Sequence, residues 1–331
     1  MRFRLLTSAL LTIAISGGIL AQRQQTQPSA GQRAPVTPAQ IEQKAQWIKD
    51  LSNWGRWGKD DELGALNLIT PAKRQQALAL AKSGTVVSLT RSVPLSERID
   101  SITAEGRPGT IPFYEIRFRR YPPDSTVAAG YSFDMQQFAY HGQVYTHIDA
   151  LCHVSYEGKV YNGYPQEQTV DVNKGCLKEG IQGLRDGIVT RGVLIDFPRL
   201  RGVSSLPPTE RLRPEDAEAW EKIAHVNVSA GDAVFLYTGW KEGMKGQSAN
   251  YDPSMVTFLK ARDVALLGAD RVSGDHELSV TALGVNLIDN ADLSRLAETA
   301  ARLKRWEFLL IVSPIPTPGA TGSLVNPLAI F

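Results

Sequence analysis

The chain has 331 residues, of which 43% are hydrophobic and 21% charged, and this composition excludes a disordered or collagen-like protein. Its 36 basic and 34 acidic residues give a formal charge of +2, which provides no strong field for nucleic acid or an anionic membrane. Two cysteines exclude a disulfide-rich framework and a Cys₄ zinc site, so the composition is typical of a soluble globular enzyme.

The N-terminal segment is typical of a secretory signal peptide. Two arginines precede the uncharged run Leu5–Leu20, and small residues follow around Ala21. We therefore expect residues 1–21 to be removed on export to the periplasm or the cell exterior. A retained segment of this length is just long enough to be a membrane anchor, and the sequence leaves both outcomes open. No other segment approaches transmembrane length, so we expect no membrane association once the signal is removed.

Residues 22–38 are rich in Gln, Pro and Ser and lack apolar periodicity, which predicts a flexible linker. Residues 39–331 then form one domain. Patterning within it predicts helices over 38–51, 70–82, 214–224, 253–262 and 291–305. Strands are predicted over 85–91, 113–119, 136–149, 190–196, 232–238 and 307–313. This order indicates a single α/β domain with a mixed sheet, without a dinucleotide-binding loop, a P-loop or an internal repeat.

Cys152 and Cys176 are 24 residues apart, and an exported protein permits a disulfide between them. The sequence does not decide whether they pair. His153 directly follows Cys152, which raises the alternative of a thiolate nucleophile. Adjacent side chains rarely point the right way for a Cys–His pair, so a structural cysteine is the preferred interpretation.

Three of the five histidines, His141, His147 and His153, fall within thirteen residues, and Asp149 lies among them. On a strand, His147 and Asp149 share a face about 7 Å apart, close enough to converge on one ion. A helical turn after Asp149 returns His153 to the same side. His141 joins them only if the chain bends, and Gly142 is a suitable residue for a bend. Imidazole and carboxylate are the ligands of catalytic zinc, manganese or iron, so the pattern predicts a metal site.

The alternative is that these histidines belong to a polar surface strand or are hydrogen-bonded in the core. The clustering favours the metal interpretation. His225 lies in a predicted loop and is assigned no role, and His276 by itself is ambiguous.

The stretch from Thr146 to His153 resembles the metal motif of the cyclase family, His-x-Gly-Thr-His-x-Asp-x-x-x-His. This family includes bacterial kynurenine formamidases and isatin hydrolases. The likeness, closest to the longer members of the family, extends over most of the mature chain, in the segments 53–58, 66–70, 191–196, 230–232, 238–239, 283–285, 289–290 and 322–327.

The resemblance implies a swivelling β/β/α fold, a homodimer or homotetramer, and one or two divalent ions per chain, zinc or manganese above all. It assigns His147 and Asp149 as ligands and places His153 at the metal centre. Gln143 stands where the family has its first histidine, and the longer members carry it two residues earlier, which makes His141 the ligand.

Members with two ions add a histidine and an acid near the C-terminal part of the chain. His276 is the histidine available there, and Asp289 is the corresponding acid in this alignment. Both are therefore candidate metal ligands.

The implied activity is hydrolysis of a small amide or cyclic amide by metal-activated water, with His153 or His276 transferring the proton. N-formylkynurenine, from tryptophan catabolism, is the reference substrate of the arylformamidases in the family. Export argues against that particular substrate, because it is made in the cytosol. Two alternatives stay open: a non-catalytic exported protein that binds a metal or small ligand, and a lactone hydrolase or cyclising lyase using the same site.

Overall fold

The structure, a computed structural model, describes residues 37–92, 113–120, 130–137, 140–142, 144–240, 249–271 and 275–331. The predicted signal peptide, nearly all of the predicted linker and Gln143 lie outside the described residues. Residues 42–331 form one compact unit, and residues 1–41 form another, of which 37–41 are described. Within the described ranges, no helix has the length and apolar character needed to span a membrane.

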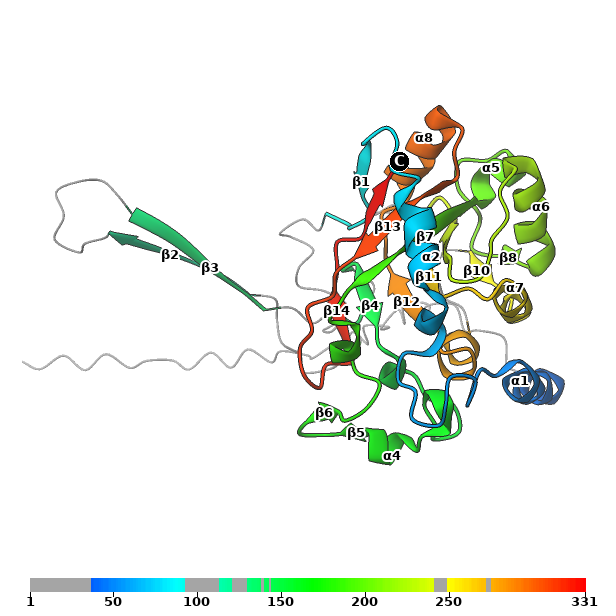
Figure 1. The fold of residues 1–331 in the computed structure, drawn as a ribbon, viewed down its shortest axis with the longest axis horizontal. Coiled ribbons are helices and arrows are strands. Elements are labelled where there is room, and N and C mark those ends of the chain that lie inside the picture. The colour runs from blue at the N-terminus through cyan, green and yellow to red at the C-terminus, as the bar shows by residue number, and fades with distance from the viewer. Residues whose placement is uncertain are drawn as a thin grey trace, which may run out of the picture. The chain divides into compact units, whose positions relative to one another are not determined.

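A nine-stranded mixed sheet lies at the centre of the unit 42–331, in the order β1-β15-β13-β7-β9-β11-β12-β4-β14 (Figure 1). The four neighbours β7, β9, β11 and β12 run parallel, and the other neighbouring pairs are antiparallel. The strands are β1 (Val86–Ser88), β4 (His147–Asp149), β7 (Ile188–Asp196), β9 (Ala233–Tyr237), β11 (Leu266–Ala269), β12 (Asn286–Asp289), β13 (Glu307–Val312), β14 (Gly322–Leu324) and β15 (Leu328–Ile330). The expected α/β fold with a mixed sheet is confirmed.

Three two-stranded pairs accompany this sheet: β2 (Phe113–Arg120) with β3 (Gly130–Gln137), β5 (Val170–Asp171) with β6 (Gly175–Cys176), and β8 (Arg211–Leu212) with β10 (Asn250–Tyr251). The α-helices are α1 (Pro38–Leu51), α2 (Pro71–Leu78), α4 (Gln166–Thr169), α5 (Phe197–Arg201), α6 (Pro214–Ala224), α7 (Met255–Ala261) and α8 (Ser294–Leu303). Short 3₁₀ turns cover Gly64–Leu68, Leu151–His153, Tyr161–Gly163 and Ile181–Leu184, and Glu277–Ala282 is π-helical.

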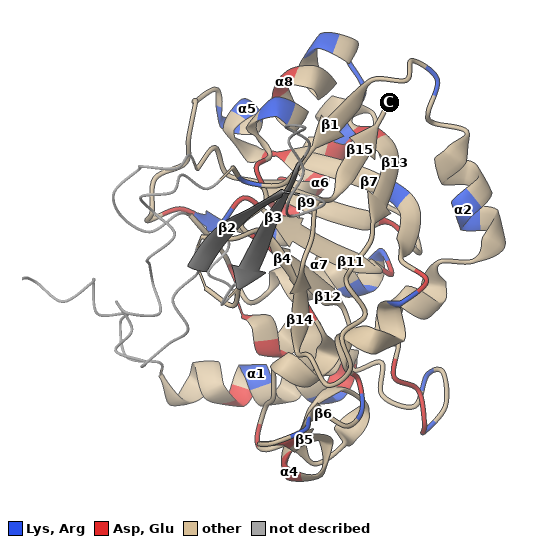
Figure 2. Ribbon diagram, turned by 90° about the vertical axis from the view of Figure 1, so that its left-hand side faces the viewer, with Lys and Arg blue, Asp and Glu red and all other residues tan. Residues whose placement is uncertain are grey.

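The central parallel strands are apolar on both faces, as expected where helices cover a sheet on two sides. On one face, Leu236 packs with Trp220 of α6 and Phe258 of α7. On the other, Phe235 packs with Leu296 of α8. Figure 2 shows the charged residues gathered on helices and loops, whereas the central strands carry few. Full burial of an apolar side chain in this core contributes about 1.5–3 kcal/mol to the free energy of unfolding.

Several predicted boundaries are confirmed. Helices α1 and α6 have the predicted bounds, and the Thr70 hydroxyl accepts a hydrogen bond from the Lys73 N–H (3.2 Å), as an N-cap does. Helix α2 ends at Leu78, before the predicted residue 82, and the Leu80 carbonyl accepts a hydrogen bond from Arg305 (2.7 Å) instead of continuing the helix.

The prediction of one strand over 136–149 is wrong. Strand β3 ends at Gln137 and β4 begins at His147, and the described residues 140–142 and 144–146 between them are not in a strand. The Asn290 amide donates to the carbonyls of Gly142 (2.7 Å) and Tyr145 (3.2 Å) and fixes this stretch as a loop. The loop supplies the bend that His141 requires.

Candidate metal centre

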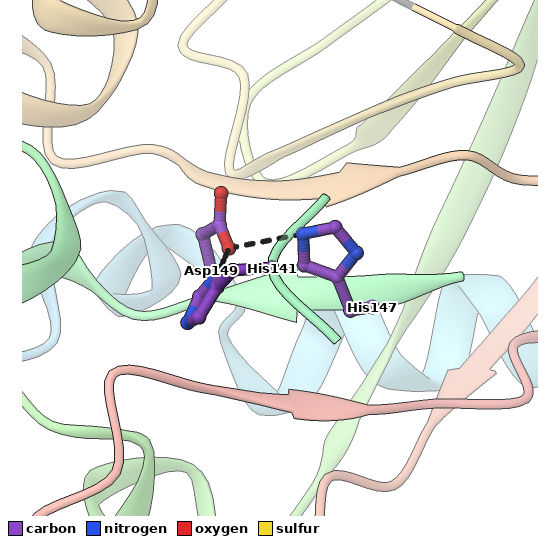
Figure 3. A group of neighbouring side chains, drawn as sticks. All are labelled: His141, His147 and Asp149. Atoms are coloured by element: carbon purple, nitrogen blue, oxygen red, sulfur yellow. Dashed lines mark ion pairs between the residues drawn. The ribbon is translucent and has the colours of Figure 1, made fainter. Parts of the chain in front are cut away.

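Strand β4 positions the first two side chains of the centre. It lies between β12 and β14, and its three residues alternate between the sheet faces. Ile148 enters the core on the α8 side, while His147 and Asp149 point to the opposite face. His147 Nε2 is 3.4 Å from Asp149 Oδ1, and both side chains are buried (Figure 3). The shared face predicted from the sequence is therefore present.

His141 reaches the same carboxylate from the loop before β4. Its Nδ1 is 3.1 Å from Asp149 Oδ1, and its Nε2 is 2.7 Å from the Thr321 hydroxyl (Figure 3). A side chain at Gly322 would collide with the main chain of β4 and with the His141 ring, so glycine is needed there. The tail of the chain thus holds the His141 ring against Asp149.

His153 lies on the 3₁₀ turn that follows β4, as the predicted helical turn requires. Its ring stacks on that of His141 with centroids 4.0 Å apart, and its Nε2 is 4.0 Å from Asp149 Oδ2. About one third of the His153 side chain is exposed, whereas Asp149 is 2% exposed. His153 therefore faces the solvent side of the cluster, which we name the β4 group: His141, His147, Asp149 and His153.

Cys152 and Cys176 form a disulfide, which answers the pairing that the sequence left open. Both cysteines are buried, and the bond joins the turn that carries His153 to strand β6. The disulfide excludes the alternative of Cys152 as a thiolate nucleophile in this state.

His276 and Asp289, which we name the β12 group, come from a separate part of the chain. Asp289 is the last residue of β12 and lies opposite His147 in the β12–β4 register. His276 immediately precedes the π-helical turn, and both residues line one pocket together with Tyr251. His276 acts electrostatically on both Asp289 and His153, so the structure brings all six predicted site residues into one region.

The charge state of the centre follows from burial and neighbouring imidazoles. Burial by itself would raise the pKa of Asp149, but the close contact with His141 and the charges of the nearby histidines outweigh it and hold the pKa below its usual value. Burial lowers the pKa of His153, against the opposing effect of Asp149, and it raises the pKa of Asp289. The β4 group is therefore an ionised carboxylate surrounded by imidazoles.

These residues fit a divalent metal ion. Among the described residues, His141, His147 and Asp149 each offer one ligand atom within 4.8 Å of the others. His141 Nδ1 and His147 Nε2 lie 3.1 Å and 3.4 Å from Asp149 Oδ1. Two ligand atoms of a tetrahedral zinc ion are expected about 3.3 Å apart. Asp149 Oδ1 and His141 Nδ1 are buried without a hydrogen-bond partner of good geometry, as ligand atoms are in a metal site described without its ion.

Contacts outside the cluster orient the imidazoles. His147 Nδ1 lies 2.8 Å from the Tyr145 carbonyl, which only an N–H can satisfy, so Nε2 presents its lone pair towards Asp149. The Thr321 hydroxyl forms a hydrogen bond with Nε2 of His141, which leaves Nδ1 of His141 facing Asp149.

Reasoning from the sequence missed these supporting groups. Thr321 is 180 residues from His141 along the chain, so no spacing rule joins them. The roles of His153, His276 and Asp289 as ligands stay predictions, because the compact set of ligand atoms within the described residues contains none of them.

A family model described as "Putative cyclase" matches residues 78–276. A crystal structure of a novel cyclase matches with a TM-score of 0.74 at 25% identity, over 86% of this chain and 99% of that chain. An isatin hydrolase bound to the product analogue thioisatinate matches with a TM-score of 0.51 at 17% identity, over 79% of this chain and 99% of that chain. Isatin hydrolase A from Ralstonia solanacearum matches with a TM-score of 0.50 at 17% identity, over 74% and 91%. No curated protein matches the sequence significantly.

Proposed function

Since the chain belongs to the cyclase family, we propose that it is a metal-dependent hydrolase of a small amide or cyclic amide, with arylformamidase-like chemistry. The observation that carries this proposal is the convergence of His141, His147 and Asp149. The Asp149 carboxylate at their centre is ionised, and its Oδ1 is buried without a hydrogen-bond partner. The isatin hydrolases that match this chain share its fold, and isatin, which gives them their name, is a cyclic amide of the class proposed here.

A bound divalent ion would polarise a carbonyl oxygen and lower the pKa of a bound water, which is what amide hydrolysis at neutral pH requires. The protein's own contribution is to fix the ligand atoms and to move protons. His153 is partly exposed beside Asp149 and is placed to accept a proton at Nε2 and return it to the leaving nitrogen. His276 is the second candidate for this transfer, since its Nε2 is buried without a hydrogen-bond partner.

Aryl formamides and isatin-like cyclic amides are the substrates we place first. Both present a planar, uncharged carbonyl group next to an aromatic ring. N-formylkynurenine is the reference compound of this class, and zinc and manganese both suit two imidazoles and a carboxylate.

We also propose that the protein works in an oxidising compartment. The Cys152–Cys176 disulfide supports this, because such bonds persist in the periplasm and outside the cell and are rare in the cytosol. Fractionation of cells that produce the full chain tests the location: recovery in the cytosol with both thiols free contradicts it.

The experiment for the site is elemental analysis of protein purified without chelator, with His147→Ala beside the wild type. We expect about one or two ions per wild-type chain and loss of metal from the variant. His225→Asn is the matched control, because it removes an imidazole from the C-cap of α6, where asparagine tolerates the left-handed conformation.

A screen of the metal-loaded protein against aryl formamides, isatin-like rings and lactones then tests the reaction. Amide turnover that His153→Ala abolishes, with metal retained, supports the proposal. Metal binding without turnover across the whole panel contradicts it and favours the non-catalytic binding protein.

A further inference from the structure

The pocket next to the β12 group contains a polar side chain that the proposed reaction has not yet used. Its floor is formed by β11 and β12, and its wall includes Tyr251, His276 and Asp289. The remaining lining residues are apolar or glycine. A small pocket of this kind presents its few polar groups to a single polar guest.

Tyr251 is a buried and firmly packed residue in the lining of this pocket. It is the last residue of β10, pairs with Leu212 of β8, and is 5% exposed within the core of the α6–α7 face. Its hydroxyl is buried without a hydrogen-bond partner of good geometry. The Ser279 hydroxyl is near enough to affect the pKa of Tyr251, but its well-formed hydrogen bond is to the carbonyl of His276 (3.3 Å). A buried tyrosine normally has a partner for its hydroxyl, so this one calls for a physical reason.

The surroundings keep Tyr251 protonated. Burial raises the pKa of Tyr251 above its usual value. The nearby Ser279 hydroxyl acts in the opposite direction, and the charges of Asp275, Asp289 and Glu277 add to the effect of burial. Tyr251 is therefore a hydrogen-bond donor throughout the physiological pH range.

The two other polar groups of the pocket complement this donor. Asp289 offers carboxylate oxygens, and His276 Nε2 is likewise buried without a partner. A buried water molecule typically makes about three hydrogen bonds, for example one accepted by its oxygen and two donated by its hydrogens. In this pocket the Tyr251 hydroxyl is the donor, and the Asp289 carboxylate and His276 Nε2 are the atoms available to the hydrogens of the water.

We propose that Tyr251 is a further catalytic residue, whose hydroxyl donates a hydrogen bond to the reacting oxygen held between His276 and Asp289. This inference rests on the proposed hydrolytic function. In the resting protein the acceptor is a water oxygen, and negative charge that develops on this oxygen during the reaction strengthens the bond. The donor is preorganised, because the β8–β10 pair and the surrounding core fix the ring.

Tyr251→Phe removes the hydroxyl and keeps the ring, so the fold is preserved. We expect kcat to fall about 100-fold with KM changed little, because one preorganised donor to a developing charge has an effect of this size. Tyr237→Phe is the matched control: Tyr237 is also buried, at the end of β9, but packs in the core of the opposite face. Its kcat should equal that of the wild type.

A crystal structure of the metal-loaded wild type gives a readout that does not depend on turnover. We expect an oxygen atom within hydrogen-bond distance of the Tyr251 hydroxyl that also contacts His276 or Asp289. A dry pocket, or a Tyr251 hydroxyl bonded to a protein atom alone, overturns the inference.

The two proposals fail in different ways. If the wild type hydrolyses no compound of the panel, the proposed function fails, and the crystal structure still decides the contact made by Tyr251. If the wild type is active and Tyr251→Phe retains kcat within about twofold, the role of Tyr251 is wrong and hydrolysis stands.

Discussion

The β4 group and the β12 group reach the same region of the molecule in different ways. In the β4 group, three imidazoles surround one carboxylate within 4.0 Å, and two of them are oriented from behind by Thr321 and the Tyr145 carbonyl. In the β12 group, His276 and Asp289 line a pocket, and His276 Nε2 has no hydrogen-bond partner. The first group contains three side chains, His141, His147 and Asp149, that could hold one metal ion, whereas the second lines a small pocket and contains a buried nitrogen without a partner. This difference is the basis of our proposal that the β4 group holds the ion and that the β12 group contacts the reacting oxygen.

The largest expected effect is a difference in metal content and activity between variants of the two carboxylates, Asp149 and Asp289. Asp149→Asn should lose the metal and about 10³-fold or more of the activity, because the amide removes the only negative charge of the His141, His147 and Asp149 set. Asp289→Asn, equally conservative in shape, should retain an ion and lose about 10²-fold. Metal analysis and kcat of both variants check this. Equal loss of metal from the two contradicts the division between the groups.

The disulfide tests what holds the β4 group together. Cys176→Ser should lower the free energy of unfolding by about 3 kcal/mol, since the bond closes a loop of 24 residues. It should also weaken metal binding, because Cys152 precedes His153. Thermal unfolding with and without a reductant, and metal titration of the folded variant, measure the two effects. A variant with unchanged metal affinity shows that the disulfide stabilises the fold without positioning His153.

The hydrogen bond behind His141 should have a smaller effect. Thr321→Val keeps the shape and removes the hydroxyl that lies 2.7 Å from His141 Nε2, so metal affinity should fall about 10- to 100-fold. Thr321→Ser keeps the hydroxyl and should restore most of the affinity. Equilibrium metal titration of both variants measures these affinities. Wild-type affinity in Thr321→Val contradicts the proposal that the Thr321 hydroxyl orients His141.

The smallest expected effect concerns stability near the β4 group. Glu179 is 2% exposed, its carboxylate oxygens lack partners, and its carbonyl accepts the Cys152 N–H (3.3 Å). Burial, with the charges of Glu62 and Asp61, raises its pKa from 4.5 to about 9. Since the folded-state pKa lies above the unfolded value, this group's contribution is complete below about pH 4.5 and is lost as the pH rises through about 9.

Glu179→Gln should therefore flatten the pH dependence of stability and raise the free energy of unfolding near pH 9 by about 1–3 kcal/mol. Thermal unfolding between pH 5 and 9 measures this. Glu167→Gln changes an exposed glutamate of α4 and serves as the control. A parallel pH profile for Glu179→Gln and the wild type shows that Glu179 is ionised in the folded protein.

Local patterns predicted the elements that have strong sequence signals. The Thr70–Pro71 helix start, the acidic start of α6 at Pro214 and the apolar β7, β9 and β13 were all found in the right places. Strands β11, β12 and β14 were not predicted, because they contain three or four residues each and acquire strand geometry through their neighbours in the sheet. The prediction of a single strand over 136–149 was wrong because Asn290, which is distant in sequence, donates hydrogen bonds that fix the loop between β3 and β4.

The sequence by itself determined the chemistry of the β4 group, because a strand and a single turn place His147, Asp149 and His153 on one side whatever the rest of the chain does. It also required a bend before His147 for His141 to join. Tertiary structure alone decided how His141 is held by Thr321, that Cys152 pairs with Cys176, and that Tyr251 shares a pocket with His276 and Asp289. These contacts join segments up to 180 residues apart, and their geometry depends on the register of a nine-stranded sheet, which no local periodicity specifies.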